Sequence, residues 1–232
     1  MDVVKVSWSG GKDSTCAVLL HLERGDKVKA VCYVPMFTAE IPLLLKEHYE
    51  FILQTADRFR LLGADVWIVH GMHYYDFVMR RSTRGKFKGR AFGFPCFLTG
   101  RCNFKKESKL KALVQVDVGD YDYEDIGIAA DEVARHGQLS EKKRSILVEL
   151  GVTEYAAMEL CRGRGVLSPL YEVAKRDGCI LCPHAKVAVR ERWFQDYPEA
   201  VPLVVELQEF VKRERPGQYP LRNQKWFIDT GD

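Results

Sequence analysis

The sequence of 232 residues lacks any run that would carry it into or across a membrane. Its first residues, MDVVKVSWSGG, contain no basic stretch followed by a long apolar one, which a secretion signal requires. No apolar run approaches the roughly 20 residues of a membrane-spanning helix. We therefore expect a cytoplasmic protein with no membrane partner.

Internal repeats and low-complexity segments are also absent. Apolar residues make up 47% of the chain, which is enough to bury a full core and excludes disorder by composition. There are seven cysteines, an odd number, and none lies beyond Cys182. In a reducing compartment they are core residues, metal ligands or reactive thiols rather than a disulfide framework. We expect Cys16, Cys32 and Cys161 to be core residues.

Acids are nearly missing between residues 80 and 111. Glu107 is the only one, against eleven basic residues, so the field of the chain is strongly asymmetric. Such a basic segment suggests an anionic partner. Phenylalanines are interleaved with the charges, which suits contact with nucleic acid (tRNA or DNA) through residues 80–111, by backbone contacts and base stacking. A lid over nucleotide phosphates, or a solvated face, explains the same composition.

Alternating and continuous apolar stretches predict an α/β fold with a parallel sheet. We expect five strands, at residues 3–8, 28–34, 66–69, 112–118 and 126–130. The spacing predicts helices at residues 14–24, 41–59, 140–150, 153–162, 184–195 and 199–214, with Gly25 ending the first and Thr153 capping the fourth. Residues 71–111 interrupt this rhythm as a basic, cysteine-containing insertion. The expected domains are residues 1–183, for an α/β nucleotide-binding domain, and 184–232, for C-terminal helices and a tail.

A glycine-rich loop follows the first expected strand and opens the first helix. It consists of Ser9, Gly10, Gly11, Lys12, Asp13 and Ser14. Glycines let the backbone approach a phosphate, and the N–H groups and dipole of the following helix favour an anion. Lys12 adds a full charge, and Asp13 can hold Mg²⁺ or cap the helix. The alternative is a glycine turn that Asp13 and Ser14 merely cap.

The loop is neither of the two familiar glycine-rich patterns. A Walker A motif would need Gly at position 6 and Ser or Thr at position 13, where this chain has Val6 and Asp13. The dinucleotide pattern GxGxxG does not fit either. Instead, SGGKDS resembles the PP-loop of the ATP pyrophosphatase superfamily, and the wider chain resembles its phosphoadenosine phosphosulfate (PAPS) reductase-like branch. The resemblance extends over most of residues 3–195 and includes IGIAADE with Arg135, SPLY at 168–171 and RDGCILCP at 176–183.

This resemblance implies an adenine nucleotide alpha-hydrolase-like fold, with about five parallel strands and the loop after the first. It implies ATP or PAPS as the nucleotide and Mg²⁺ as the ion. Members of the superfamily split ATP between its α and β phosphates and adenylate an acceptor. In such a reaction Lys12 and the loop amides stabilise the departing pyrophosphate. We expect adenylation for sulfur transfer.

Two alternatives to this activity remain open. The first is a sulfonucleotide reductase, but these enzymes carry a nucleophilic cysteine near the C-terminus, beyond any cysteine of this chain. The second is a nucleic-acid-binding subunit that only senses ATP.

Four cysteines occur in loop contexts beside Gly or Pro and form a candidate metal site. Cys179 and Cys182 have the CxxC spacing, and Cys96 with Cys102 is the natural second pair. Four thiolates suit Zn²⁺ or a [4Fe–4S] cluster. The resemblance favours the iron–sulfur cluster; unligated thiols and a redox CxxC are the alternatives.

Other candidates follow the expected strands. Glu132 and Arg135 come after the fifth, and Arg135 can pair with phosphate or an acceptor's acidic group, or simply with Glu132. Tyr33, in the second strand, is a candidate for the wall of the adenine pocket or for the core. An apolar stripe at Val201, Val204, Val205 and Phe210 fits either a homodimer face or the core.

Overall fold

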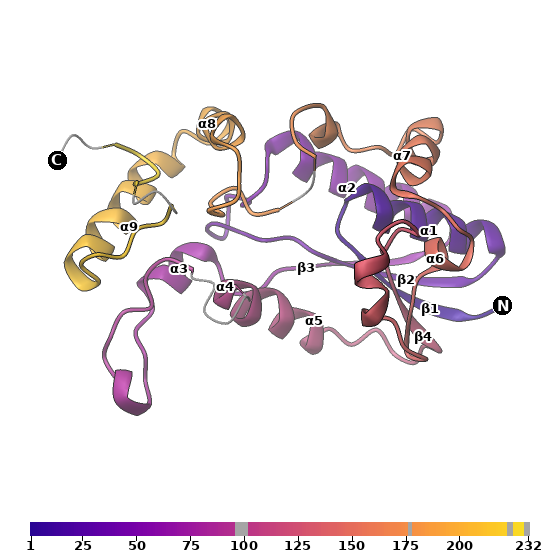
Figure 1. Cartoon of the computed structure of the whole chain (residues 1–232), viewed down its shortest axis with the longest axis horizontal. Helices are drawn as coiled ribbons and strands as arrows, with labels where there is room; N and C mark the ends of the chain where they lie inside the picture. Colours follow the sequence, from indigo (N-terminus) through magenta and orange to yellow (C-terminus); the bar gives the residue numbers. More distant parts are fainter. Residues whose placement is uncertain (96–101, 176–177, 222–224, 230–232) are drawn as a thin grey trace. The chain divides into compact units, whose positions relative to one another are not determined.

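A computed structural model describes residues 1–95, 102–175, 178–221 and 225–229. The chain is an α/β protein with a five-stranded, all-parallel sheet and C-terminal helices (Figure 1). It divides into two compact units, each assembled from three segments. Unit 1 comprises Met1–Val34, Glu47–Val69 and Gln115–Asp177, and unit 2 comprises Pro35–Lys46, His70–Val114 and Gly178–Asp232.

Unit 1 holds the sheet, with strand order β3-β2-β1-β4-β5. The strands are β1 (Val3–Trp8), β2 (Lys27–Tyr33), β3 (Asp65–Val69), β4 (Tyr123–Ile126) and β5 (Lys143–Arg144). The helices of this unit are α1 (Lys12–Arg24), α2 (Lys46–Leu61), α6 (Ile146–Glu149) and α7 (Glu154–Gly163), with 3-10 turns η4 (Val133–Gln138) and η5 (Pro169–Glu172). β1 is therefore central, and its carboxyl end lies between those of β2 and β4.

Local sequence explains where α1 ends and where α7 begins. Gly25 adopts a left-handed conformation with φ 82°, and the amides of Gly25 and Asp26 bond to the carbonyls of Leu22 and His21 at the end of α1. Thr153 accepts a hydrogen bond from the amide of Ala156 at 3.2 Å, which caps α7 as expected.

The core of unit 1 combines apolar packing with a buried polar network. Trp8 packs edge-on against Phe59 with ring centroids 5.3 Å apart. His21 is fully buried between two carboxylates, 2.9 Å from Asp26 and 3.0 Å from Asp125. Asp125 also accepts the amide of Ile146 at 2.7 Å. The network therefore joins α1, β4 and α6, and it explains why a strand can carry a buried acid.

Unit 2 contains the insertion and the C-terminal helices. Its elements are α3 (Tyr74–Met79), η1 (Gly85–Phe87), α4 (Asn103–Lys105), the π-helical η3 (Lys106–Leu110), α5 (Lys111–Gln115), α8 (Val187–Asp196) and α9 (Ala200–Glu214). Phe37 and Trp193 pack edge-on at 5.5 Å, and Phe104 packs against Tyr74 and Phe77 at 5.3 and 5.4 Å. Val204 and Phe210 are buried, so the apolar stripe of α9 contributes to this core.

Some expected elements are wrong. Residues 112–118 are not a strand: α5 continues the helical run from Asn103, and Val114, at 86% exposure, faces solvent. In the described part of the chain, no strand pairs with this short alternation of apolar residues. The expected helix at 140–150 is reduced to α6, because β5 occupies Lys143–Arg144. The last main strand lies at Tyr123–Ile126 rather than 126–130, and α2 begins only at Lys46, after buried leucines that belong to unit 2.

Candidate nucleotide-binding site

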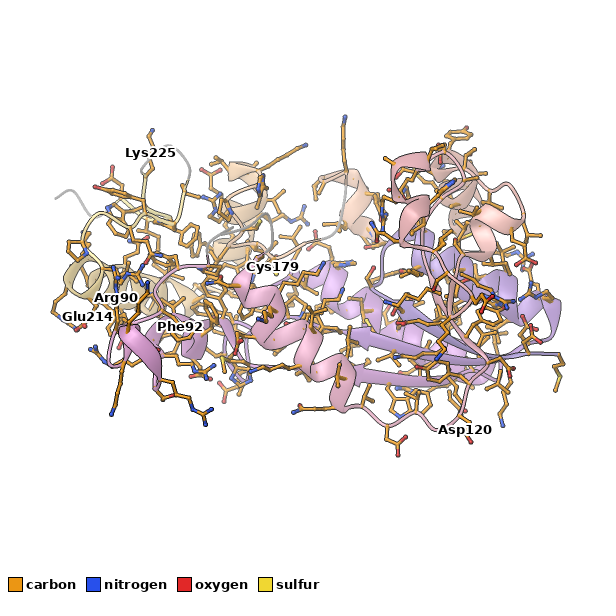
Figure 2. The ribbon with its side chains drawn as sticks, turned by 60° about the horizontal axis from the view of Figure 1, so that its bottom comes forward. Arg90, Phe92, Asp120, Cys179, Glu214 and Lys225 are labelled. Atoms are coloured by element: carbon orange, nitrogen blue, oxygen red, sulfur yellow. The ribbon has the colours of Figure 1, made fainter. Side chains whose placement is uncertain are left out.

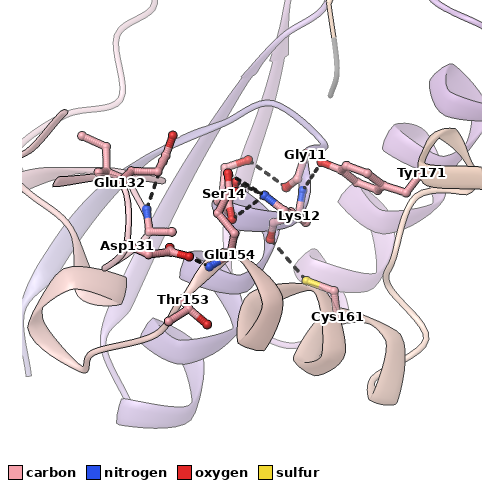
Figure 3. Close-up of polar contacts among 12 residues, drawn as sticks. Gly11, Lys12, Ser14, Asp131, Glu132, Thr153, Glu154, Cys161 and Tyr171 are labelled. Atoms are coloured by element: carbon pink, nitrogen blue, oxygen red, sulfur yellow. Dashed lines mark hydrogen bonds and ion pairs between the residues drawn. The ribbon is translucent and has the colours of Figure 1, made fainter. Parts of the chain in front are cut away.

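The glycine-rich loop lies where β1 ends and α1 begins (Figure 3). Gly10 has φ +76°, a conformation that L side chains rarely adopt, and Gly11 is the N-cap of α1. The loop closes on itself through its two serines. Ser14 Oγ accepts from the amide of Ser9 and donates to the carbonyl of Gly11, both at 3.1 Å. Sequence alone therefore placed the loop correctly between strand and helix.

Two glycines allow close approach of neighbouring segments to this loop. A Cβ on Gly10 would lie 2.6 Å from Ile52 Cγ1 of α2. A Cβ on Gly127, which directly follows β4, would lie 2.6 Å from the amide nitrogen of Ser14. Real Cβ atoms essentially never come so close, so both positions require glycine. The backbone after β4 thus supports the first turn of α1.

The ammonium of Lys12 is held by two carboxylates. Its Nζ lies 2.7 Å from Asp13 Oδ2 and 3.3 Å from Glu154 Oε1, the first residue of α7. Burial lowers the pKa of Lys12, but the hydrogen bonds and charges of Asp13 and Glu154 outweigh it, so this pKa is raised overall. Burial also raises the pKa of Asp13 above its ordinary value, against the opposing effect of Lys12. Lys12 is therefore a charged group whose present partners are anions.

The backbone of Lys12 has two further supports. Its N–H donates to the hydroxyl of Tyr171 at 2.8 Å, and its carbonyl accepts from the thiol of Cys161 at 3.3 Å (Figure 3). A hydrogen bond with Cys16 raises the pKa of Cys161 and burial acts in the same direction, so that thiol stays protonated and can donate. Both cysteines are fully buried, as expected of core residues.

A cavity of about 400 Å³ adjoins Tyr171. Apolar and charged side chains share its lining, among them Met158, Leu167, Pro169, Arg162 and Glu172. Its volume lies within the range of small-molecule sites, roughly 300 to 1,000 Å³.

Glu132 and Arg135 form the local pair that their spacing allows. Arg135 Nη1 lies 2.9 and 2.8 Å from the two carboxylate oxygens of Glu132, which also accepts the amide of Ala129 at 3.2 Å. Burial raises the pKa of Glu132, but Arg135, this amide and the charge of Lys12 lower it below its ordinary value. Glu132 therefore interacts electrostatically with Lys12 of the glycine-rich loop. Tyr33 is buried at the end of β2, in register with Val69 of β3.

Three cysteines of the expected metal site lie in unit 2, and Cys96 lies outside the described residues. Burial raises the pKa of the Tyr74 hydroxyl well above its usual range, and the charges of Cys179, Cys102 and Cys182 act in the same direction. The charges of all three thiols therefore act on one buried hydroxyl, which has no hydrogen-bond partner among the described residues. However, within the described part of the chain no three His, Cys, Asp or Glu side chains are arranged to hold a metal ion.

The CxxC segment itself is fixed by its backbone. The amide of Ile180 bonds to the carbonyl of Leu43 at 3.2 Å, and that of Cys182 to the carbonyl of Cys179 at 3.1 Å. The guanidinium of Arg190 is also buried, and burial lowers its pKa against the opposing charges of Tyr74 and Cys182.

Sequence reasoning missed two residues of the loop's surroundings. Glu154 begins a helix, and acidic residues are common there because the helix dipole favours them. Its position in the sequence therefore gave no sign of a contact with the loop. Tyr171 lay within the SPLY motif, but nothing in that motif indicates contact with Lys12. No protein-family model matches the chain, and no curated protein matches it. Among the described helices, none combines the length and apolar character needed to cross a membrane.

Proposed function

We propose that the chain binds ATP and Mg²⁺ through Ser9–Ser14 and activates an acceptor by adenylation, for sulfur transfer. The observation that carries this proposal is the position of Lys12. This cation is the first residue of α1, and α1 begins at the carboxyl end of the central strand. Open parallel sheets bind ligands at this edge, and helix N-termini bind phosphates.

The proposed reaction uses the loop to stabilise the leaving group. An acceptor oxygen attacks the α phosphorus of ATP, the bond from this phosphorus to the bridging oxygen breaks, and pyrophosphate leaves. Lys12 and the loop amides bind the charge that develops on pyrophosphate. Once phosphate oxygens replace Asp13 as the partner of Lys12, the carboxylate of Asp13 becomes available to Mg²⁺. This ion commonly takes only one or two carboxylates besides substrate phosphates.

The surroundings of the loop supply candidates for binding the acceptor. Arg135 is 42% exposed beyond its pair with Glu132, so it can contact a phosphate or an acidic group. The cavity beside Tyr171 adds space for a small-molecule acceptor. Tyr33 stays a candidate for the adenine pocket.

The cysteines form the second part of the proposal. Cys96, Cys102, Cys179 and Cys182 would hold a [4Fe–4S] cluster or, in the alternative, Zn²⁺. This assignment rests on the spacing of the four cysteines, and the charges of the three described thiols all act on the buried hydroxyl of Tyr74. Such a group would position or deliver sulfur, and no step of the adenylation depends on it.

Pyrophosphate release from ATP tests the first part. Lys12→Ala should lower the rate by roughly 10² to 10³, the loss seen when one stabiliser of developing charge is removed. Lys27→Ala is the control, because Lys27 is an exposed lysine at the start of β2. An unchanged rate in Lys12→Ala, or release of phosphate and ADP, would contradict the proposal. Sulfite release from PAPS with a thiol donor would instead indicate a sulfonucleotide reductase.

Metal and acid-labile sulfide analysis of anaerobically purified protein tests the second part. Iron with sulfide is expected, and Cys179→Ser should abolish it while Cys16→Ala leaves it intact. Zinc would select the alternative metal. Absence of both metals would show that these cysteines are unligated thiols.

A further inference from the structure

A basic hairpin projects from the end of α3 in unit 2 (Figure 1). It consists of residues 80–92, with η1 at its tip and an antiparallel bridge between Arg81 and Ala91. The amides of Ser82 and Phe92 bond to the carbonyls of Arg90 and Arg80 at 2.9 and 2.8 Å. The hairpin is thus an ordered element held by its own backbone.

The base and the tip of this hairpin differ in their charge balance. At the base, Arg80 lies 3.0 Å from Glu107 and Arg81 lies 2.8 Å from Glu214 of α9. The side chain of Arg215 further fixes the hairpin by donating to the carbonyl of Ala91 at 2.8 Å. Figure 2 shows Arg90 and Phe92 on the hairpin, with Glu214 on α9. Acids and main-chain contacts therefore anchor the base to unit 2.

The tip carries only positive charge. Residues 80–92 contain six cations and no acid, and five of the cations are exposed, one of them the ion-paired Arg81. The four exposed cations that follow it, which we name the tip cations, are Arg84, Lys86, Lys88 and Arg90. An exposed turn with several cations and no acid in its own sequence creates a positive field that attracts a polyanion.

The described aromatic side chains of this basic segment point into unit 2. Phe92 packs edge-on against Phe77 at 5.5 Å and lies under the guanidinium of Arg80 at 5.2 Å. Phe94 is 1% exposed and Phe104 is 3% exposed. Phe94 and Phe104 are therefore too buried to serve as platforms for bases, and Phe92 already packs against Phe77 and Arg80. Proteins that bind single strands combine cations with such aromatic platforms, whereas contact with a duplex backbone requires cations alone.

We propose that the basic hairpin docks on the phosphate backbone of double-helical nucleic acid, with little dependence on base sequence. The tip cations would displace counterions from the phosphates, which makes the binding strongly salt-dependent. DNA and RNA duplexes share this backbone chemistry. The docking does not depend on the proposed ATP chemistry of unit 1.

Fluorescence anisotropy with labelled duplex DNA, duplex RNA and single-stranded DNA tests this inference on the full chain. The variant replaces all four tip cations by alanine. Its affinity for a duplex should fall at least about ten-fold at low salt, and the slope of log K against log salt should become shallower by roughly three to four. The control replaces four exposed lysines outside the hairpin, Lys27, Lys46, Lys142 and Lys143, by alanine. It changes net charge equally and should bind nearly as well as the parent chain.

The outcomes separate the alternatives. Comparable affinity for DNA and RNA duplexes, lost only in the tip variant, supports the inference, and preference for one duplex identifies the source. Equal losses in tip and control variants, tighter binding of the single strand, or no duplex binding by the parent chain would overturn it. So would a tip variant that loses ATP binding but retains the duplex, because the hairpin would then be a nucleotide lid. An Arg84→Ala/Lys88→Ala double variant, expected to lose about half of the slope change, covers the case in which the fourfold variant does not fold.

Discussion

The main-chain N–H of Lys12 donates a hydrogen bond of 2.8 Å to the hydroxyl of Tyr171, 159 residues further along the chain. The same N–H belongs to the first turn of α1, where a bound phosphate would take its hydrogen bonds. Tyr171 thus occupies one of the donors that the proposed ligand needs. If the loop binds phosphate as proposed, the phosphate and this tyrosine would compete for one amide.

Tyr171→Phe should therefore bind inorganic pyrophosphate more tightly. Removing the competing hydroxyl is worth one hydrogen bond, about 1 kcal/mol, or roughly a five-fold gain in affinity. Isothermal titration calorimetry measures the change, and Tyr155→Phe, an exposed tyrosine of α7, is the control. Weaker binding by Tyr171→Phe would mean that the hydroxyl positions the loop for the ligand instead of competing with it.

Gly127→Ala should distort the glycine-rich loop, because the added Cβ would press on the first turn of α1. The added Cβ would meet the amide nitrogen of Ser14 at 2.6 Å, and this backbone cannot move without shifting the start of α1. We expect a loss of roughly 1 to 3 kcal/mol in the free energy of unfolding, together with weakened nucleotide binding. Gly137→Ala is the matched control, since a Cβ there meets nothing within 4 Å. Equal melting temperatures and affinities for the two variants would refute this role of Gly127.

His21→Leu should be among the most damaging changes in unit 1. It would remove the ring that joins the buried oxygens of Asp26 and Asp125, at a cost of roughly 3 kcal/mol or more. Chemical denaturation followed by tryptophan fluorescence gives the free energy of unfolding. His73→Ala removes a histidine–carboxylate contact at a partly exposed site and should cost within about 0.5 kcal/mol. Similar losses in both variants would argue against a stabilising network.

Glu107 should make the stability of unit 2 depend on acid pH. The hydrogen bond from Lys111 lowers the pKa of Glu107; burial opposes this, but the charges of Lys111 and Arg80 keep the pKa below its ordinary value. The folded state therefore favours the ionised form. This stabilisation is complete above the unfolded pKa of about 4.3 and disappears as the pH falls through the lower folded pKa.

Melting temperatures measured from neutral pH to about pH 3 check this expectation. Glu107→Gln should melt below the parent chain at neutral pH, and the difference should shrink as the pH falls below about 4. Glu141→Gln, at an exposed site, should show a small difference at every pH. A constant gap between Glu107→Gln and the parent chain would indicate that the carboxylate charge is not responsible.

Features encoded by neighbouring residues were predictable from the sequence. The strand, glycine loop and helix over residues 3–25 depend on local alternation and on Gly25, and Thr153 caps its helix by contact with a residue three positions away. Features set by distant partners were not predictable. β4 contains Asp125, which looks unsuited to a buried strand until its Oδ2 is seen to pair with His21 and with the amide of Ile146. Likewise, Glu154 and Tyr171 meet Lys12 only through the packing of α7 and the segment after it.

The apolar alternation at residues 112–118 led to the opposite error, because here a local pattern predicted a strand that does not form. A short alternating run is compatible with both strand and helix, and only the presence of a neighbouring strand decides between them. Among the described residues no strand pairs with this run, and α5 extends the helical run of unit 2 instead. The residues from Ser9 to Ser14, which the sequence placed between a strand and a helix, are encoded by neighbouring positions, whereas the partners of Lys12 on α7 and at Tyr171 are not.

The strand order also has a consequence for synthesis on the ribosome. β1 is made first, but its neighbour β4 begins only at Tyr123. At typical translation rates of about 5 to 20 residues per second, one edge of the central strand stays unpaired for on the order of ten seconds. An unpaired edge is a template for aggregation, so the nascent chain is most vulnerable in this interval. Slowed translation between β1 and β4 should therefore lower the yield of folded protein more than the same delay after Arg144.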